Sequence, residues 1–277
     1  MIELLSLGLM RRALTAALLV GLAAPAIGTF IVQRRLALLG DGIGHVALTG
    51  VALGFLTGTA PVLTAVAVSV LGAVTIELVR ARGRTSGDVA LALLFYGGIA
   101  GGALLISLAP GGSNTTLMSY LFGSISSVTA QDVWAIGLLA AAVLGVVAVF
   151  GRELYVLCQD EEVARASGLP VRFLSLLIAV TAALTVVIAM RVVGLLLVSA
   201  LMVVPVATSQ QFTRGFRATM LLSMVFGVLA TVGGLTSSFY VEVPPGAIIV
   251  VVALAGFVLA LGLGRFVRRS RSQESTP

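Results

Sequence analysis

The chain has 277 residues, of which 59% are hydrophobic and 10% are charged, and its mean hydropathy is +1.15. This composition excludes a soluble globular domain, in which about a quarter of residues are charged. The 17 basic residues are all arginine. The net charge of +6 does not indicate nucleic-acid binding, because the distribution of these arginines relative to the membrane, described below, accounts for it. A single cysteine, Cys158, excludes an intrachain disulfide.

Nine apolar segments approach the ~20 residues that a helix needs to cross a bilayer. They predict an all-α fold, a polytopic transmembrane helical bundle of about nine spans. Two segments between residues 170 and 210 nearly touch, which leaves the count open by one. The expected spans are approximately Ala13–Val32, Leu36–Thr57, Pro61–Val79, Val89–Leu108, Val133–Phe150, Phe173–Met190, Val192–Thr208, Ala218–Tyr240 and Gly246–Gly264.

The arginines predict the orientation of the chain in the membrane. Of the 17, 14 fall in alternate connections: after the first and third spans, between the fifth and sixth, between the seventh and eighth, and after the last. Connections rich in arginine stay in the cytoplasm. The N-terminus is therefore expected outside and the C-terminus inside, with a basic and polar cytoplasmic tail at residues 266–277.

The first span has a second possible interpretation. Arg11 and Arg12, an apolar run and Ala24-Pro-Ala26 together resemble a secretory signal peptide. Cleavage near residue 26 would leave Arg34 and Arg35 beside an external N-terminus, against the positive-inside pattern. We therefore expect a retained span.

The second span contains the most informative residues, Asp41 and His45, the latter being the only histidine. Residues at i and i+4 lie on one face of a helix, so a carboxylate and an imidazole can converge on one point. Both are ligands that divalent transition metals accept. The alternative is a structural polar pair between helices, which typically contributes only ~0.6–2 kcal/mol. Ionisable groups within a membrane more often serve function, which favours a metal site.

Glycines recur along the same span at intervals of four to six residues. Small residues at such spacing allow helices to approach closely, so we expect these glycines to serve helix packing. They are Gly40, Gly44, Gly50, Gly54 and Gly58.

The longest polar stretch, residues 151–172, is predicted to be a cytoplasmic loop. Asp160 is a good N-cap, and Glu161 and Glu162 suit the positive end of a helix dipole. Gly168 followed by Pro170 is a stop signal. A short surface helix is therefore expected at about 161–167. It is either a solvated connector or a lever that another subunit contacts.

The predicted external connections carry weaker signals. The segment 110–123 is expected to be a turn followed by a short amphipathic stretch. It either lines the outer mouth or is a plain surface turn. Arg191 and Glu242 are expected to be exposed charges that could pair with a delivery protein, although exposed charges seldom have a specific role.

Four segments, in this order, resemble the permease subunit of bacterial ABC importers for manganese, zinc or iron. They are Gly40-Asp-Gly-Ile-Gly-His45, Tyr120-Leu-Phe-Gly123, Asp160-Glu-Glu-Val-Ala-Arg-Ala-Ser-Gly-Leu-Pro170 and Val193-Gly-Leu-Leu-Leu-Val-Ser-Ala-Leu-Met-Val-Val-Pro-Val-Ala207. The resemblance covers nearly the whole chain, and residues 1–265 would form the permease domain. The residues Gly42-Ile43-Gly44 depart from the family, which more often has Ala-Leu-Ser there.

The resemblance implies a bacterial plasma-membrane protein in which two copies of the permease pair around a central pathway. Two copies of a separate ATPase would dock on the cytoplasmic side, and an extracytoplasmic metal-binding protein would deliver the ion. It assigns Asp41 and His45 as the metal-coordinating pair. It assigns the coupling helix to the segment that contains Asp160, Glu161, Glu162, Arg165 and Gly168.

The residues themselves agree that this chain is not an ATPase, because a P-loop needs a lysine and the chain has none. One histidine also cannot supply the ligands of a metalloprotease. We therefore expect a permease without a cofactor of its own, which passes zinc, manganese or iron through an Asp/His site. A proton-coupled secondary transporter and an iron-chelate permease are the alternatives. Secondary transporters usually contain an internal repeat, and the sequence shows no convincing second copy of the Asp-x-x-x-His segment. A permease for a metal chelate needs no metal ligands in its pathway, so Asp41 and His45 favour the bare ion.

Overall fold

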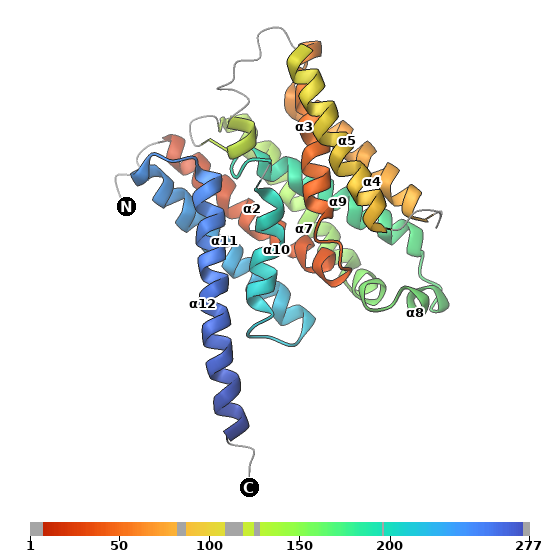
Figure 1. Ribbon diagram of the computed structural model, residues 1–277, viewed down its shortest axis with the longest axis vertical. Coiled ribbons are helices and arrows are strands. Elements are labelled where there is room, and N and C mark those ends of the chain that lie inside the picture. Colours follow the sequence, from red (N-terminus) through yellow and green to blue (C-terminus); the bar gives the residue numbers. More distant parts are fainter. Residues whose placement is uncertain (1–7, 82–86, 109–118, 125–127, 196, 274–277) are drawn as a thin grey trace.

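The computed structural model describes residues 8–81, 87–108, 119–124, 128–195 and 197–273, and these residues form helices and no strand. Figure 1 shows the helices packed as one bundle, from which the carboxyl end of α12 projects. The all-α prediction is confirmed. The elements are α2 (Gly8–Gln33), α3 (Leu39–Thr57), α4 (Pro61–Ala81), α5 (Gly87–Leu108), α7 (Ala130–Gln159), α8 (Glu161–Ala166), α9 (Val171–Met190), α10 (Val198–Ser209), α11 (Phe216–Val241) and α12 (Pro245–Gln273).

Eight helices in the described part of the chain are long and apolar enough to cross a membrane. The seventh expected span is the exception, because only α10, with 12 residues, is helical there. At 1.5 Å per residue it reaches about 18 Å, short of the ~30 Å hydrocarbon core. The preceding residues form turns, and Gly194 has a φ of +89°, which a helix does not accommodate. The prediction of a regular span at 192–208 was therefore wrong.

Helix α7 runs beyond the end of the span expected there. The predicted span stopped at Phe150, whereas the helix continues to Gln159. In this extension Leu154, Leu157 and Cys158 are buried, at the spacing of one helix face. Residues 151–159 are therefore a continuation of α7, and the loop predicted at 151–172 is largely helical.

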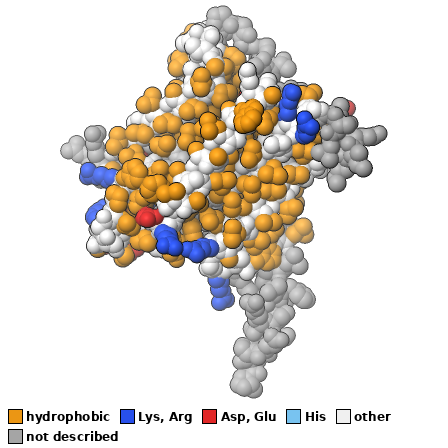
Figure 2. All heavy atoms as spheres, turned by 180° about the vertical axis from the view of Figure 1, so that it is seen from behind, with side chains coloured by type: hydrophobic (Ala, Val, Ile, Leu, Met, Phe, Trp, Pro, Cys, Tyr) orange, Lys and Arg blue, Asp and Glu red, His pale blue; other side chains and the backbone are white. Residues whose placement is uncertain are grey.

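Helices α2 and α9 form the centre of the bundle, and most of their residues are buried. Most of their buried residues are small or branched, and α2 meets α11 so closely that a Cβ on Gly21 would lie 2.9 Å from Val228 Cα. Helices α4, α5, α7 and α12 are outer helices, and most of their residues are not buried. Figure 2 shows a broad hydrophobic surface broken by few charged side chains, as a lipid-facing protein requires.

Helix α8 and the connection between α10 and α11 lie toward the lower side of Figure 1, the side to which the carboxyl end of α12 points. This common side agrees with the alternation of connections expected from the sequence, although its assignment to the cytoplasm stays a prediction. The tail expected at 266–277 begins within α12, which extends to Gln273, and residues 274–277 lie outside the described part. Most of the external segment expected at 110–123 is also outside it.

Candidate metal centre

Helix α3 places Asp41 in its first turn and His45 one turn later. The helix begins at Leu39 without a side-chain cap, and its N-terminal dipole favours a carboxylate at this position. Both side chains are half-buried. The spacing of four residues puts them on one face of the helix, as the sequence predicts.

Helix α10 meets Asp41 through Ser199, whose hydroxyl donates a hydrogen bond to Asp41 Oδ1. Ser199 lies in the first turn of α10, immediately after the interruption that shortens the seventh span. Gly40 permits this approach, because a Cβ there would lie 3.1 Å from Ser199 Cβ. A Cβ on Gly44 would lie 3.1 Å from the Leu195 carbonyl oxygen. Two glycines therefore bring the carboxylate to the start of α10.

Helix α5 packs against the histidine. The ring of Phe95 lies 4.5 Å from the His45 ring, edge to face at 78°. A Cβ on Gly98 would come within 2.7 Å of the His45 backbone carbon, and Thr49 Oγ1 donates to the Gly98 carbonyl at 2.9 Å. The close packing of α5 against α3 holds the His45 imidazole beside the Phe95 ring.

The glycines predicted to serve helix packing do so within the chain. A Cβ on Gly50 would lie 2.6 Å from Ala65 Cα, and one on Gly54 would lie 2.7 Å from Pro61 Cα, both on α4. Gly58 has another role: it caps α3 with a φ of +67° and has nothing near it. The prediction is thus confirmed for Gly50 and Gly54 and was wrong for Gly58.

An ion pair fixes the interruption between α9 and α10. Arg191, at the end of α9, donates to both Asp132 oxygens at 2.9 Å through Nη2 and to Oδ1 at 3.1 Å through Nε. Its guanidinium also lies 5.2 Å from the centre of the Tyr120 ring. The two charged side chains are 18% and 13% exposed. The prediction that Arg191 is an exposed charge was wrong, because sequence spacing does not reveal Asp132 as its partner, whereas Glu242 is exposed.

Backbone packing reinforces the same interruption. The Leu195 amide donates to the Tyr120 carbonyl at 2.9 Å. A Cβ on Gly194 would lie 2.5 Å from the Phe122 carbonyl carbon, and one on Gly246 would lie 2.7 Å from the Phe122 oxygen. Such close approach requires glycine, and it anchors the turn that leads to Ser199.

Within the described part of the chain, no group of three or more His, Cys, Asp or Glu side chains is placed to hold a metal ion. Asp41 and His45 therefore have no third ligand of these types among the residues that the structure describes. The hydroxyl of Ser199 and the ring of Phe95 are the two contacts that sequence reasoning missed. Ser199 lies 158 residues from Asp41, and in the sequence only the family-like segment 193–207, which contains it, marks the region.

The expected surface helix is confirmed as α8, which spans Glu161–Ala166. Asp160 caps it, accepting hydrogen bonds from the amides of Glu162 at 2.8 Å and Val163 at 3.1 Å. Gly168, which follows the C-cap residue Ser167, has a φ of +77° and turns the chain away from the helix. Arg165 pairs with Glu161 along the exposed side at 3.1 Å. The capping signals in the sequence thus specify this element, whereas its coupling role stays a prediction.

The bundle and its surface define a multi-pass helical membrane protein with a polar pair on a buried helix. The chain belongs to the ABC 3 transport family, whose profile matches residues 6–264. It is therefore a transport permease of the bacterial plasma membrane, as the motifs in the sequence predict.

Its relatives include several proteins of metal transport. The chain is 34% identical to the manganese transport system membrane protein MntC of Halalkalibacterium halodurans, over 98% of this chain and 95% of that protein. It is 31% identical to the manganese import system permease protein ScaB of Streptococcus gordonii, over 94% of each. The solved structure of PsaBC from Streptococcus pneumoniae in complex with Fab superposes with a TM-score of 0.84 at 32% identity, over 94% of this chain and 93% of that one. A putative metal-chelate type ABC transporter in an inward-facing conformation shares the fold, with a TM-score of 0.70 at 14% identity, over 91% and 85%.

Proposed function

We propose that this chain is the permease subunit of an ATP-driven importer for a divalent transition-metal ion, with manganese the favoured cargo and zinc or iron the alternatives. The observation that carries the proposal is the pair Asp41 and His45 on one face of α3. Oxygen and nitrogen ligands suit all three metals. The names of the relatives that transport manganese favour that ion among them.

Two ligands from one chain bind a divalent ion weakly. A second copy of this chain, related by a two-fold axis beside α3, would supply another carboxylate and another imidazole, and so complete a four-ligand site. The absence of a third His, Cys, Asp or Glu ligand within the described residues supports this reading. A site of transit also has to release its ion, so moderate affinity suits it.

The partners of the permease follow from its chemistry and family. The chain lacks lysine, so ATP is hydrolysed on a separate ATPase subunit. That subunit contacts the coupling helix α8 and its flanking residues Asp160, Glu161, Glu162, Arg165 and Gly168, on the cytoplasmic side. The N-terminus lies outside, the side on which a metal-binding protein delivers the ion.

Uptake of radioactive manganese by cells that express the permease with its ATPase tests this function. His45→Ala and Asp41→Ala should each abolish uptake, because each removes two of the four proposed ligands from a dimer. Leu138→Ala, on the exposed face of α7, is the matched control and should transport normally. Competition by zinc and ferrous iron ranks the three cargoes.

Normal uptake in either ligand variant, at equal abundance in the membrane, contradicts the proposal. Uptake that continues without the ATPase subunit would instead support a proton-coupled secondary transporter. If manganese uptake is unchanged and uptake of a metal chelate is lost, the result would support a chelate permease.

A further inference from the structure

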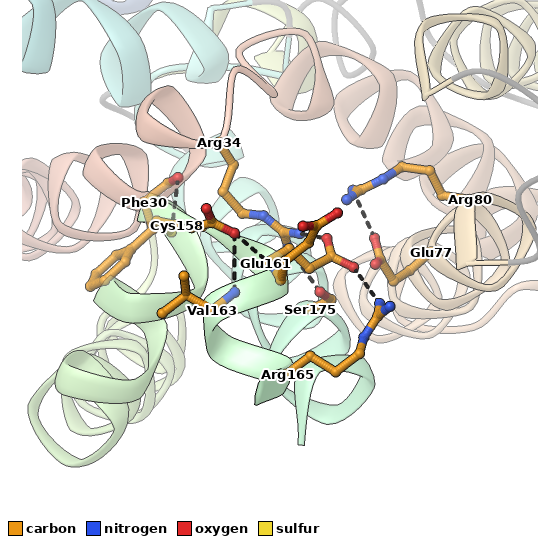
Figure 3. Close-up of polar contacts among 11 residues, drawn as sticks. Phe30, Arg34, Glu77, Arg80, Cys158, Glu161, Val163, Arg165 and Ser175 are labelled. Atoms are coloured by element: carbon orange, nitrogen blue, oxygen red, sulfur yellow. Dashed lines mark hydrogen bonds and ion pairs between the residues drawn. The ribbon is translucent and has the colours of Figure 1, made fainter. Parts of the chain in front are cut away.

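The connection between α2 and α3 contains a buried cation. The side chain of Arg34 is 6% exposed, although it belongs to a connection at the end of the bundle. Its Nη1 donates to Ser175 Oγ on α9 at 2.9 Å, and its Nη2 donates to Glu161 Oε2 on α8 at 3.2 Å. Figure 3 shows the guanidinium between these two partners. One side chain thus joins three elements.

The end of α7, which leads directly into α8, is tied to the end of α2 by further contacts. Gln33 donates to Gln159, at the end of α7, at 3.2 Å, and the Cys158 thiol lies 3.6 Å from the Phe30 carbonyl oxygen to which it donates. Glu161 uses its other oxygen for Arg165, which is 70% exposed. The pair with Arg34 is therefore the inward-facing contact of α8, and the pair with Arg165 is the outward-facing one.

The chain between Arg34 and Asp41 is short, and several of its amides donate backbone hydrogen bonds. Arg35 reverses the chain with a φ of +58°. The Leu36 amide donates to Ile31 at 2.9 Å, the Leu39 amide donates to Leu36 at 2.8 Å, and Gly42 donates to Leu38 at 3.1 Å. Only six residues thus separate the cation from the carboxylate, so a displacement of Arg34 reaches the first turn of α3.

A groove of about 900 Å³ leaves room for such a displacement. It lies between the end of α4 and the α8–α9 segment, and its lining includes Glu77, Arg80, Glu161 and Ser175. Glu77 and Arg80 pair with each other at 3.0 Å across one helix turn. In Figure 3 this pair lies across from the Arg34 cluster, and no bond joins the two. Helix α8 is thus fixed to the α2–α3 connection and faces a groove on the side of α4.

We propose that Arg34 is the positioning residue that transmits movement of α8 to the first turn of α3, and through it to Asp41. This inference rests on the proposed function, since it assumes that an ATPase moves α8 and that Asp41 binds the ion. The two hydrogen bonds of the Arg34 guanidinium hold α8 and α9 to the α2–α3 connection, so a displacement of α8 moves the start of α3. Without these bonds, α8 would be displaced and the start of α3 would keep its position.

The test is the amount of manganese transported per ATP hydrolysed by the permease–ATPase complex in proteoliposomes. Arg34→Gln should lower this ratio about tenfold, within the usual range of coupling between sites, while ATP hydrolysis remains near the wild-type rate. Glu161→Gln should lower the same ratio; its absolute rate of ATP hydrolysis is not part of the test, because Glu161 also lies where the ATPase is proposed to dock. The double variant should be no worse than either single one, because both remove the same contact. Arg214→Ala, which removes an exposed arginine from the α10–α11 connection, is the control and should keep the wild-type ratio.

An unchanged ratio in Arg34→Gln overturns the inference, as does a double variant whose loss is the product of the two single losses. A merely structural role would reduce hydrolysis and transport together and would also overturn it. If Arg34→Gln fails to accumulate, the ratio in Glu161→Gln decides, because that carboxyl is 45% exposed and tolerates a neutral isostere. A wild-type complex that hydrolyses ATP and moves no metal would instead refute the proposed function.

Discussion

The ion pair between Asp132 and Arg191 should contribute measurably to the stability of the bundle, and Asp132→Asn tests it. The substitution keeps the shape of the side chain and its ability to cap α7 by accepting from the Thr129 amide, a bond of 2.9 Å. It removes the charge that faces the guanidinium. Arg191 would then keep its contact with the Tyr120 ring and lose its counter-ion.

The magnitude follows from the burial of the pair. Breaking a fully buried pair by removing one partner costs about 3–5 kcal/mol. Here the side chains are 13% and 18% exposed, so water compensates part of the loss. The cation–π contact with Tyr120 is present in both proteins, so it does not change this difference. We expect the free energy of unfolding to fall by about 2–3 kcal/mol.

Equilibrium unfolding by SDS in mixed micelles measures this change. Arg165→Ala is the matched control, because it breaks an ion pair of similar length whose partners are 70% and 45% exposed. Exposed pairs contribute about 0–1 kcal/mol, so the control should unfold almost as the wild type does. Equal losses in the two variants would refute the argument from burial.

Two further substitutions test the interruption and its contact with the candidate site. Ser199→Ala should raise the KM for manganese uptake about tenfold, since loss of a group that orients a metal ligand usually costs 10–100-fold; an unchanged KM would show that Asp41 needs no such partner. Gly194→Ala should lower the free energy of unfolding by about 3 kcal/mol, because a positive φ and contact with the Phe122 backbone both oppose a Cβ. Gly145→Ala, which meets nothing within 4 Å, should not destabilise, and a similar loss there would contradict the packing argument.

The sequence specified the elements whose signals are local. Apolar runs of about 20 residues located the long helices, and Asp160 and Gly168 located both ends of α8. The prediction of the seventh span failed because the length and hydropathy of this segment match those of a helix, whereas its backbone geometry depends on packing against other segments. Gly194 is held at a positive φ among the backbones of residues 120–123, which are distant in sequence. Hydropathy carries no information about such a crossing.

The candidate site also has a part that the sequence predicts and a part that it does not. The face shared by Asp41 and His45 follows from helical spacing alone, and the structure keeps both on α3. The partners of these residues do not follow from spacing. Phe95 and Ser199 reach them from α5 and α10 because glycines on both sides of the contacts allow the helices to close in. The sequence marks Arg34 only as a sign of topology, because its burial depends on Glu161 and Ser175, which are distant in sequence.

Ser199 and Arg34 both act on the start of α3, and they do so in different ways. Ser199 holds Asp41 directly, from the first turn of a short helix whose N-terminal dipole also favours the carboxylate. Arg34 holds the backbone seven residues earlier and makes its charged contact with α8. The first bond orients the carboxylate as a ligand and lowers the cost of holding it within the membrane. The second leaves that carboxylate's own contacts untouched, so movement at α8 can change the position of Asp41 without competing for the ligand.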